Sequence, residues 1–284
     1  MHVQKSFSKN MGAVLYLVTT PIGNLSDMTP RGIEILKSVA LIASEDTRVT
    51  KKLCNHFEIK TPLTSYFEHN KNQKTNYILE RLANGDDVAL VSDAGMPLIS
   101  DPGDQLVEKV LEKGHSVVPI PGANAALTAL IASGLVVQPF LFYGFLNRQK
   151  SKKRQELLSL SQSKFTMVFY ESPYRLKETL SLILEELGDR RVVIARELTK
   201  LYEEFVRGTV AECLDYLDEI KGEVVLILEG CSLDGQSDDW WKDLSLDEHV
   251  DSYVKNGMKT NEGIKKVAND RGVSKQEVYK AYHR

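Results

Sequence analysis

Short apolar runs alternate with amphipathic stretches along the first half of the chain. Stretches with the 3.6-residue spacing of a helix separate the runs, and one of these begins with Pro30 directly after the capping residue Thr29. The runs occupy residues 14–19, 40–44, 63–67, 88–91 and 117–120. Buried strands that alternate with helices favour a mostly parallel sheet of the doubly wound type. We therefore expect an N-terminal α/β domain over residues 12–136, after a flexible extension at 1–11.

From Pro139 onward, strands follow one another with short connections. Apolar runs lie at 140–145, 165–170, 191–195, 204–209 and 222–229. Helices are expected at 150–160 and from Tyr174. Because strands joined by short connections pair antiparallel, we expect a mixed sheet in a second α/β domain over residues 137–231. Residues 232–245 are acidic and polar, which is typical of a linker.

The C-terminal segment 246–284 is predicted to form three short helices. Helical patterns at 260–270 and 275–282 are separated by a turn that contains Gly272 and a capping Ser274. The segment from Tyr253 to the end contains eight Lys/Arg and three Asp/Glu. This spacing on a basic segment is that of a helix-turn-helix, although a packed helical pair with no ligand fits equally well.

Composition narrows the class of protein. Hydrophobic residues make up 42% and charged residues 26% of the chain, as in ordinary globular proteins, and no apolar run is long enough to span a bilayer. The first ten residues lack the apolar core of a signal peptide, and the three cysteines are widely spaced. We therefore expect a cytoplasmic location without disulfides or a zinc cluster. The net charge of −3 neither favours nor excludes nucleic acid, but residues 148–154 hold five positive charges and no negative one.

The stretch 88–103 organises the candidate site. A buried strand runs into a loop with two Gly, two Pro and two Asp, and a helical pattern resumes at Asp104. In α/β sheets, ligands bind beyond the carboxyl ends of the strands, where this loop falls. We expect the loops 21–23, 121–126 and 170–173 to converge with it. These loops are rich in Gly, Ala and Pro and poor in Lys, which favours a bulky, partly apolar ligand.

Several common sites are not indicated. The dinucleotide fingerprint G-x-G-x-x-G and the P-loop motif are absent, and no Ser-His-Asp or Cys-His set stands out. His56 and His69 have no partner at metal-ligand spacing, so no metal is expected.

Five segments of the sequence, 15–24, 44–48, 91–103, 119–126 and 169–173, resemble the tetrapyrrole-methylase superfamily. Within it they are similar to members that methylate a cytidine 2′-oxygen of 16S ribosomal RNA. The resemblance extends over about residues 12–284. It implies a homodimer of two-domain subunits that binds S-adenosylmethionine in the cleft between the sheets.

The resemblance also implies cofactor contacts, carried over motif by motif. They are expected from Pro21, Gly23, Asp93, Ala94, Gly95, Met96, Ile99, Ser100, Asn124, Ala125, Tyr170, Glu171, Gly208 and Thr209.

Methyl transfer to a hydroxyl requires positioning of the reactants and removal of a proton from the acceptor. The acidic residues on the expected cleft loops, Glu45, Asp46, Asp93 and Asp101, are all candidates for the base, and the sequence does not choose among them. Arg48 is a candidate to hold a phosphate or to orient a carboxylate. Capping of the next helix by Asp46 or Thr47 is the alternative interpretation of that motif.

Basic residues outside the cleft are expected to hold RNA through its phosphates. The candidates are Arg148, Lys152, Lys153, Arg175, Arg196, Lys265, Lys266 and Lys275. Two other functions stay open: a methylase of the same superfamily that acts on a tetrapyrrole, another small molecule or a modified residue, and a non-catalytic nucleic-acid-binding protein. A basic tail favours the RNA enzyme over a porphyrin enzyme, which has no need of one.

Overall fold

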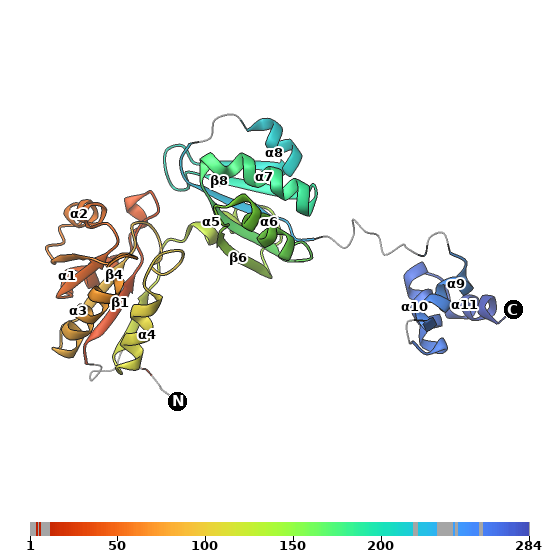
Figure 1. Ribbon diagram of the computed structural model, residues 1–284, viewed down its shortest axis with the longest axis horizontal. Helices are drawn as coiled ribbons and strands as arrows, with labels where there is room; N and C mark the ends of the chain where they lie inside the picture. Colours follow the sequence, from red (N-terminus) through yellow and green to blue (C-terminus); the bar gives the residue numbers. More distant parts are fainter. Residues whose placement is uncertain are drawn as a thin grey trace. The chain divides into compact units, whose positions relative to one another are not determined.

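The chain forms two compact units, residues 1–231 and 232–284, which are described separately. The computed structural model describes residues 4, 6, 12–217, 221–231, 241, 244–255 and 258–283 (Figure 1). Most of the expected extension at 1–11 and of the expected linker at 232–245 lies outside the described residues.

The first sheet is parallel throughout and has the strand order β3-β2-β4-β1-β5. Its strands are β1 (Val14–Val18), β2 (Leu41–Ser44), β3 (Leu63–Ser65), β4 (Val88–Val91) and β5 (Ser116–Ile120). The helices are α1 (Pro30–Ser38), α2 (Thr47–His56), α3 (Lys71–Ala83) and α4 (Asp104–Glu112), with a 3₁₀ turn η1 at Leu25–Asp27. Residues of α1 and α2 share one apolar cluster with the sheet, and residues of α3 and α4 share another. The expected doubly wound arrangement is confirmed.

The second sheet is mixed, as predicted, with the order β6-β7-β10-β8-β9. Only β6 and β7 pair in parallel, and every other neighbouring pair is antiparallel. Its strands are β6 (Phe140–Phe145), β7 (Thr166–Glu171), β8 (Arg191–Arg196), β9 (Glu204–Thr209) and β10 (Val224–Leu228). Helices α6 (Lys150–Ser159), α7 (Pro173–Leu187) and α8 (Val210–Tyr216) pack on one face.

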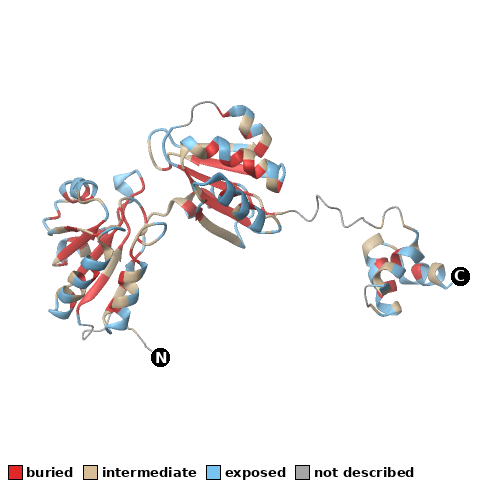
Figure 2. Cartoon of the chain, viewed as in Figure 1, coloured by how far each residue is buried: buried red, intermediate tan, exposed pale blue. Residues whose placement is uncertain are grey.

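Helix α5 (Ala125–Ile131) follows the last strand of the first sheet but packs on the second. Its Ala126, Ala129 and Leu130 are buried against Val168, Val193 and neighbouring residues of the second sheet. Small side chains bring the helix close to the strands, which ties the two sheets together beside the candidate site. Figure 2 shows that the buried positions of both sheets are concentrated on the strands and on the inward helix faces.

Local sequence explains several helix ends. The Thr29 hydroxyl accepts a hydrogen bond from the backbone of Gly32, which caps α1. The Asp46 carboxylate accepts one from the backbone of Arg48, so α2 begins at Thr47, directly after this cap. Similarly, α7 begins at Pro173 and not at Tyr174, since proline suits the first helical turn.

The described residues of the tail form three helices, α9 (Leu246–Lys255), α10 (Thr260–Arg271) and α11 (Lys275–Tyr282). Gly272 ends α10 in the left-handed conformation with φ 65°, and the Ser274 hydroxyl caps α11. Val250, Ile264, Val267 and Val278 form its small core. The helix-turn-helix spacing therefore corresponds to a folded unit. Among the described residues, no helix is both long and apolar enough to cross a membrane.

Candidate active site

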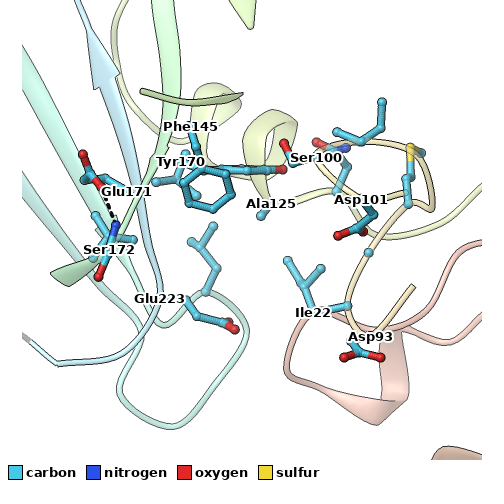
Figure 3. Close-up of a pocket in the computed structure, with 18 of the residues that line it drawn as sticks. Ile22, Asp93, Ser100, Asp101, Ala125, Phe145, Tyr170, Glu171, Ser172 and Glu223 are labelled. Carbon is cyan, nitrogen blue, oxygen red and sulfur yellow. Dashed lines mark hydrogen bonds between the residues drawn. The ribbon is translucent and has the colours of Figure 1, made fainter. Parts of the chain in front are cut away.

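A cavity of about 370 Å³ is lined by residues from both sheets. The loop between β4 and α4 supplies one wall, and the start of α5 supplies part of the floor. The ends of β6 and β7 and the start of β10 supply the opposite wall (Figure 3). Ten of the expected cofactor residues line it: Asp93, Ala94, Gly95, Met96, Ile99, Ser100, Asn124, Ala125, Tyr170 and Glu171.

The loop 93–103 is held in an unusual backbone conformation. Two residues with side chains, Leu98 and Ser100, have positive φ values of 72° and 69°. Such values are uncommon outside glycine, and they cluster where a structure holds a ligand site. Backbone hydrogen bonds in both directions join Gly95 to Thr20, so the first loop of the chain fixes this one. The loop that the sequence predicted to be functional therefore has a constrained backbone.

Four carboxyl groups gather at the carboxyl ends of β2 and β4. Glu45 and Asp46 follow β2, whereas Asp93 and Asp101 belong to the loop after β4. Arg48 pairs with Asp46 at 2.6 Å, and its hydrogen bonds lower the pKa of Asp46 to about 2. Burial and the charges of Asp93 and Asp46 raise the pKa of Glu45, and burial raises that of Asp93. Among the described residues, no three such side chains form a group that could hold a metal ion.

Asp101 differs from the other three carboxyl groups. Burial is the main cause that raises its pKa to about 6, and the charges of Glu45 and Asp93 add to this. Its side chain lines the cavity and points into it (Figure 3). A carboxyl group with a pKa near neutrality at a cavity wall is suited to accept a proton. This separation of roles among the carboxyl groups was not visible in the sequence.

Aromatic residues form the wall opposite Asp101. The rings of Phe145 and Tyr170 lie 5.5 Å apart between centroids. Glu171 also borders the cavity, but its carboxylate is occupied: it accepts hydrogen bonds from the Ser172 backbone at 2.8 Å and the Thr179 hydroxyl at 2.6 Å. Glu171 therefore fixes the start of α7 beside the cavity, and Tyr170 offers the cavity an apolar face.

A second cavity of about 330 Å³ adjoins the first, since Ile22, Asp93, Ala94 and Glu223 line both. The expected cofactor residues Pro21 and Gly23 line this second cavity and not the first. A Cβ atom on Gly23 would lie 2.6 Å from Lys200 Cγ, so the missing side chain lets the loop after β8 approach closely.

Two expected cofactor residues lie elsewhere. Gly208 and Thr209 are at the end of β9, where Thr209 pairs with Arg191 at the start of β8. The cavity lies at the opposite end of this sheet, beside the end of β7 and the start of β10. Placing them at the pocket was wrong, because the antiparallel return of β9 carries them away. Thr209 instead caps α8.

The expected RNA-binding residues differ in solvent exposure and in the partners that they already have within the protein. Arg148 and Lys152 are exposed near the start of α6, as are Lys265, Lys266 and Lys275 in the tail. Lys153 was misplaced: it is fully buried and donates to Glu178 at 2.8 Å and to Thr179 at 3.0 Å. Arg175 donates to the carbonyl of Leu146, and Arg196 pairs with Glu204. These last two cations stabilise the fold of the second domain, which a charge pattern alone does not indicate.

Comparison with protein families connects this geometry to known enzymes. The model for tetrapyrrole (corrin/porphyrin) methylases matches residues 14–214, which include the first sheet and strands β6 to β9 of the second. The chain belongs to the tetrapyrrole methylase family. It is therefore a methyltransferase by family, and the matched region contains the residues that line the two cavities except Gly222, Glu223, Val224 and Val225.

Relatives within the tetrapyrrole methylases extend the match to the whole chain. A protein of Bacillus subtilis (strain 168) named ribosomal RNA small subunit methyltransferase I is 55% identical over 99% of this chain and 98% of its own. A protein of the same name from Halalkalibacterium halodurans is 52% identical over 100% of this chain and 99% of its own. One from Synechocystis is 42% identical over 94% of this chain and 96% of its own.

Solved structures share the tetrapyrrole methylase fold at low identity. A diphthine synthase superposes with a TM-score of 0.58 at 13% identity, over 76% of this chain and 90% of its own. A cobalt precorrin-4 methyltransferase superposes with a TM-score of 0.58 at 17% identity, over 76% of this chain and 94% of its own. A uroporphyrin-III C-methyltransferase of Thermus thermophilus superposes with a TM-score of 0.56 at 16% identity, over 79% of this chain and 98% of its own.

Some residues that line the first cavity were not expected from the sequence. The start of β10 and its preceding turn contribute Gly222, Glu223, Val224 and Val225, and Ile22, Phe145 and Leu198 add apolar surface. The pair Gly222-Glu223 just before an apolar run was a usable signal, because Gly23-Asn24 in the first loop likewise joins a glycine to a polar residue.

Proposed function

We propose that this methyltransferase transfers a methyl group from S-adenosylmethionine to the 2′-oxygen of a cytidine in 16S ribosomal RNA of the small subunit. The observation that carries the proposal is the full-length match to relatives named ribosomal RNA small subunit methyltransferase I, which includes the basic tail. The porphyrin and diphthine enzymes, in contrast, account for only 76–79% of this chain.

The first cavity fits S-adenosylmethionine in size and chemistry. Its volume of about 370 Å³ lies in the range of small-molecule sites. Ile22, Phe145 and Val225 supply apolar contacts for an adenine ring, and the carboxylates of Asp93 and Asp101 complement a cationic sulfur. When bound, the cofactor supplies a methyl group that is already activated for displacement.

Asp101 is the residue that we propose as the general base. The 2′-hydroxyl of a ribose is a weak acid, so its attack requires proton removal in the transition state. Asp101 lines the cavity, and among the described residues no hydrogen bond from a protein donor to its carboxylate is found. The Asp46 carboxylate is engaged by Arg48, and the Asp93 carboxylate accepts from the Asp46 backbone. These two residues therefore hold the loops in place around Asp101.

Exposed cations outside the cavities are proposed to hold the RNA backbone. Arg148 and Lys152 lie in the segment that follows β6 and begins α6, and Lys265, Lys266 and Lys275 belong to the tail. Phosphate contacts of this kind give affinity without sequence preference. We further propose a homodimer that acts in the cytoplasm, where ribosomal subunits are assembled.

The test uses S-adenosylmethionine with a labelled methyl group and small ribosomal subunits that lack the modification. After digestion of the RNA, mass spectrometry identifies the labelled nucleoside, and we expect a 2′-O-methylcytidine. Label on a different nucleoside would overturn the cytidine assignment. Label on an added tetrapyrrole precursor, with none on RNA, would support a small-molecule methylase of the same family.

A further inference from the structure

We propose that the second cavity, between η1, α2 and the loop after β8, binds the acceptor nucleotide of a single-stranded RNA segment. This inference rests on the proposed function, because it assigns the acceptor side of the same reaction. Methyl donor and acceptor oxygen must approach to about 3–3.5 Å, so the acceptor site has to open onto the cofactor cavity. The second cavity does so through Ile22, Asp93, Ala94 and Glu223. Figure 3 shows the labelled Ile22, Asp93 and Glu223 together at one end of the first cavity.

The lining of the second cavity has the composition of a nucleotide site. Leu25 and Val49 line it and remain 41% and 40% exposed, which leaves an apolar surface available to a base. Lys52 lies three residues after Val49, so the two side chains share one face of α2. An exposed ammonium group beside an apolar surface matches a base together with its phosphate.

The opposite side of the cavity is formed by the loop after β8. Lys200 lines the cavity, but its ammonium is held by Glu197 at 2.8 Å and by Glu223 at 2.9 Å. This pairing fixes the loop, and Lys52 is left as the lining cation that forms no ion pair among the described residues. Two residues further on, Tyr202 is 69% exposed. Single-stranded RNA is commonly recognised by exposed aromatic rings on which bases stack.

The size of this cavity selects against a large ligand. Its volume of about 330 Å³ is near the lower end of small-molecule sites and suits one nucleoside. Two carboxylates, Asp93 and Glu223, and two ammonium groups, Lys52 and Lys200, line the cavity, so its formal charge is balanced. The acceptor is therefore a single nucleotide unit, with its neighbours passing over α2 and Tyr202.

The experiment compares Lys52→Glu with Lys51→Glu in the full-length protein, with small ribosomal subunits as substrate. Lys51 is exposed on the same helix but does not line the cavity, so it controls for charge alone. We expect Lys52→Glu to raise the KM for the subunit well above that of Lys51→Glu. Both variants should bind S-adenosylmethionine like the wild type, because neither lysine lines the first cavity. For Lys52→Ala, the slope of log affinity against log salt should fall by about 0.7, the contribution of one phosphate contact to a single strand.

A second pair of variants tests the aromatic side. Tyr202→Ala should weaken RNA binding about 5- to 150-fold, the range for loss of one stacked base. Tyr216→Ala, also exposed but on α8, should leave it unchanged. Equal KM values for Lys52→Glu and Lys51→Glu, with active wild type, would overturn this inference alone. A wild type that binds the cofactor but methylates no RNA would instead overturn the proposed function, and this inference with it.

Discussion

The backbone N–H of Asp46 donates a hydrogen bond of 3.1 Å to the carboxylate of Asp93. This bond joins the loop after β2 to the loop after β4, which are 47 residues apart in the chain. Asp93, and Glu45 next to Asp46, carry the charges that contribute to the raised pKa of Asp101. The acidic end of the first sheet is therefore a connected unit, and its chemistry can be tested one residue at a time.

Asp101→Asn should reduce kcat by about 10²–10⁴-fold, the usual contribution of a positioned base. In the wild type, kcat/KM should fall as the pH drops below about 6, because the free enzyme then holds Asp101 protonated. The pH profile of methyl transfer measures both. If Asp101 instead binds a cofactor hydroxyl, the substitution will raise the KM for the cofactor and leave kcat near the wild-type value.

The same substitution should stabilise the protein without ligand at alkaline pH. The folded pKa of about 6 exceeds the ordinary 3.8, so ionisation of Asp101 costs free energy of folding as the pH rises between these values. The cost is absent below pH 3.8 and complete above pH 6. Asp101→Asn should therefore raise the free energy of unfolding by about 1–3 kcal/mol at pH 8 but not near pH 4. Denaturant melts at both pH values check this, and equal gains at both would contradict it.

Gly23→Ala should weaken cofactor binding. The added Cβ would lie 2.6 Å from Lys200 Cγ, 2.8 Å from Thr199 Oγ1 and 3.0 Å from the Leu198 carbonyl. The loop would have to shift, and it carries Leu198 of the first cavity and Lys200 of the second. Overpacking of this kind costs about 1–3 kcal/mol. Calorimetric titration with S-adenosylmethionine measures the loss, and Gly85→Asn, a site with open space around it, is the control.

Lys153→Met should change the stability of the protein, whereas Lys152→Ala should change its affinity for RNA. Lys153 is buried and paired with the half-exposed Glu178, so its replacement should lower the free energy of unfolding by about 1–3 kcal/mol and leave RNA affinity unchanged. Lys152 is exposed, and its replacement should lower RNA affinity without a change in stability. Thermal melts and filter-binding measurements on both variants separate the two effects. A loss of RNA affinity in folded Lys153→Met would contradict the assignment.

The tail should lose stability as the solution becomes acidic. His249 is fully buried and stacks on Trp241 at 5.2 Å, and burial lowers its pKa, with Arg271 adding to the effect. Because the folded tail disfavours the charged imidazole, stability is full above the ordinary pKa of 6.5 and falls as the pH drops below it. Hydrogen exchange of the amides of α9–α11 at pH 7.5 and 5.5 measures this. His249→Phe should remove the difference, while His283→Phe, an exposed site, should retain it.

Neutralising the tail lysines should flatten the salt dependence of RNA binding. Lys265, Lys266 and Lys275 are exposed, although Lys266 also pairs with Asp270 at 3.0 Å. Replacement of all three by Gln should reduce the slope of log affinity against log salt by up to about 2 units if each meets a phosphate. An unchanged slope in the folded variant would remove the tail from the RNA-binding surface.

Local sequence determined much of this fold because its signals act over short distances. The alternation of apolar runs and helices specified the parallel first sheet, and the composition of 93–103 marked the loop that lines the first cavity. The rule that ligands bind beyond the carboxyl ends of strands predicted that loops 121–126 and 170–173 lie beside the same cavity. Other features depended on partners far away in the chain. Lys153 is buried because α7 places Glu178 and Thr179 beside it, and Gly208 leaves the pocket because β9 returns antiparallel to β8.

The position of β10 has a consequence for protein synthesis. It is the last strand of the second sheet along the chain, yet it lies between β7 and β8, and its first residues line the first cavity. A ribosome therefore has to translate Val224–Leu228 and release them from its exit tunnel before the sheet can close and the cofactor wall can form. Until then, a nascent chain holds the complete first sheet with an unfinished second one. An enzyme proposed to modify ribosomes would thus gain its cofactor site only near the end of its own translation.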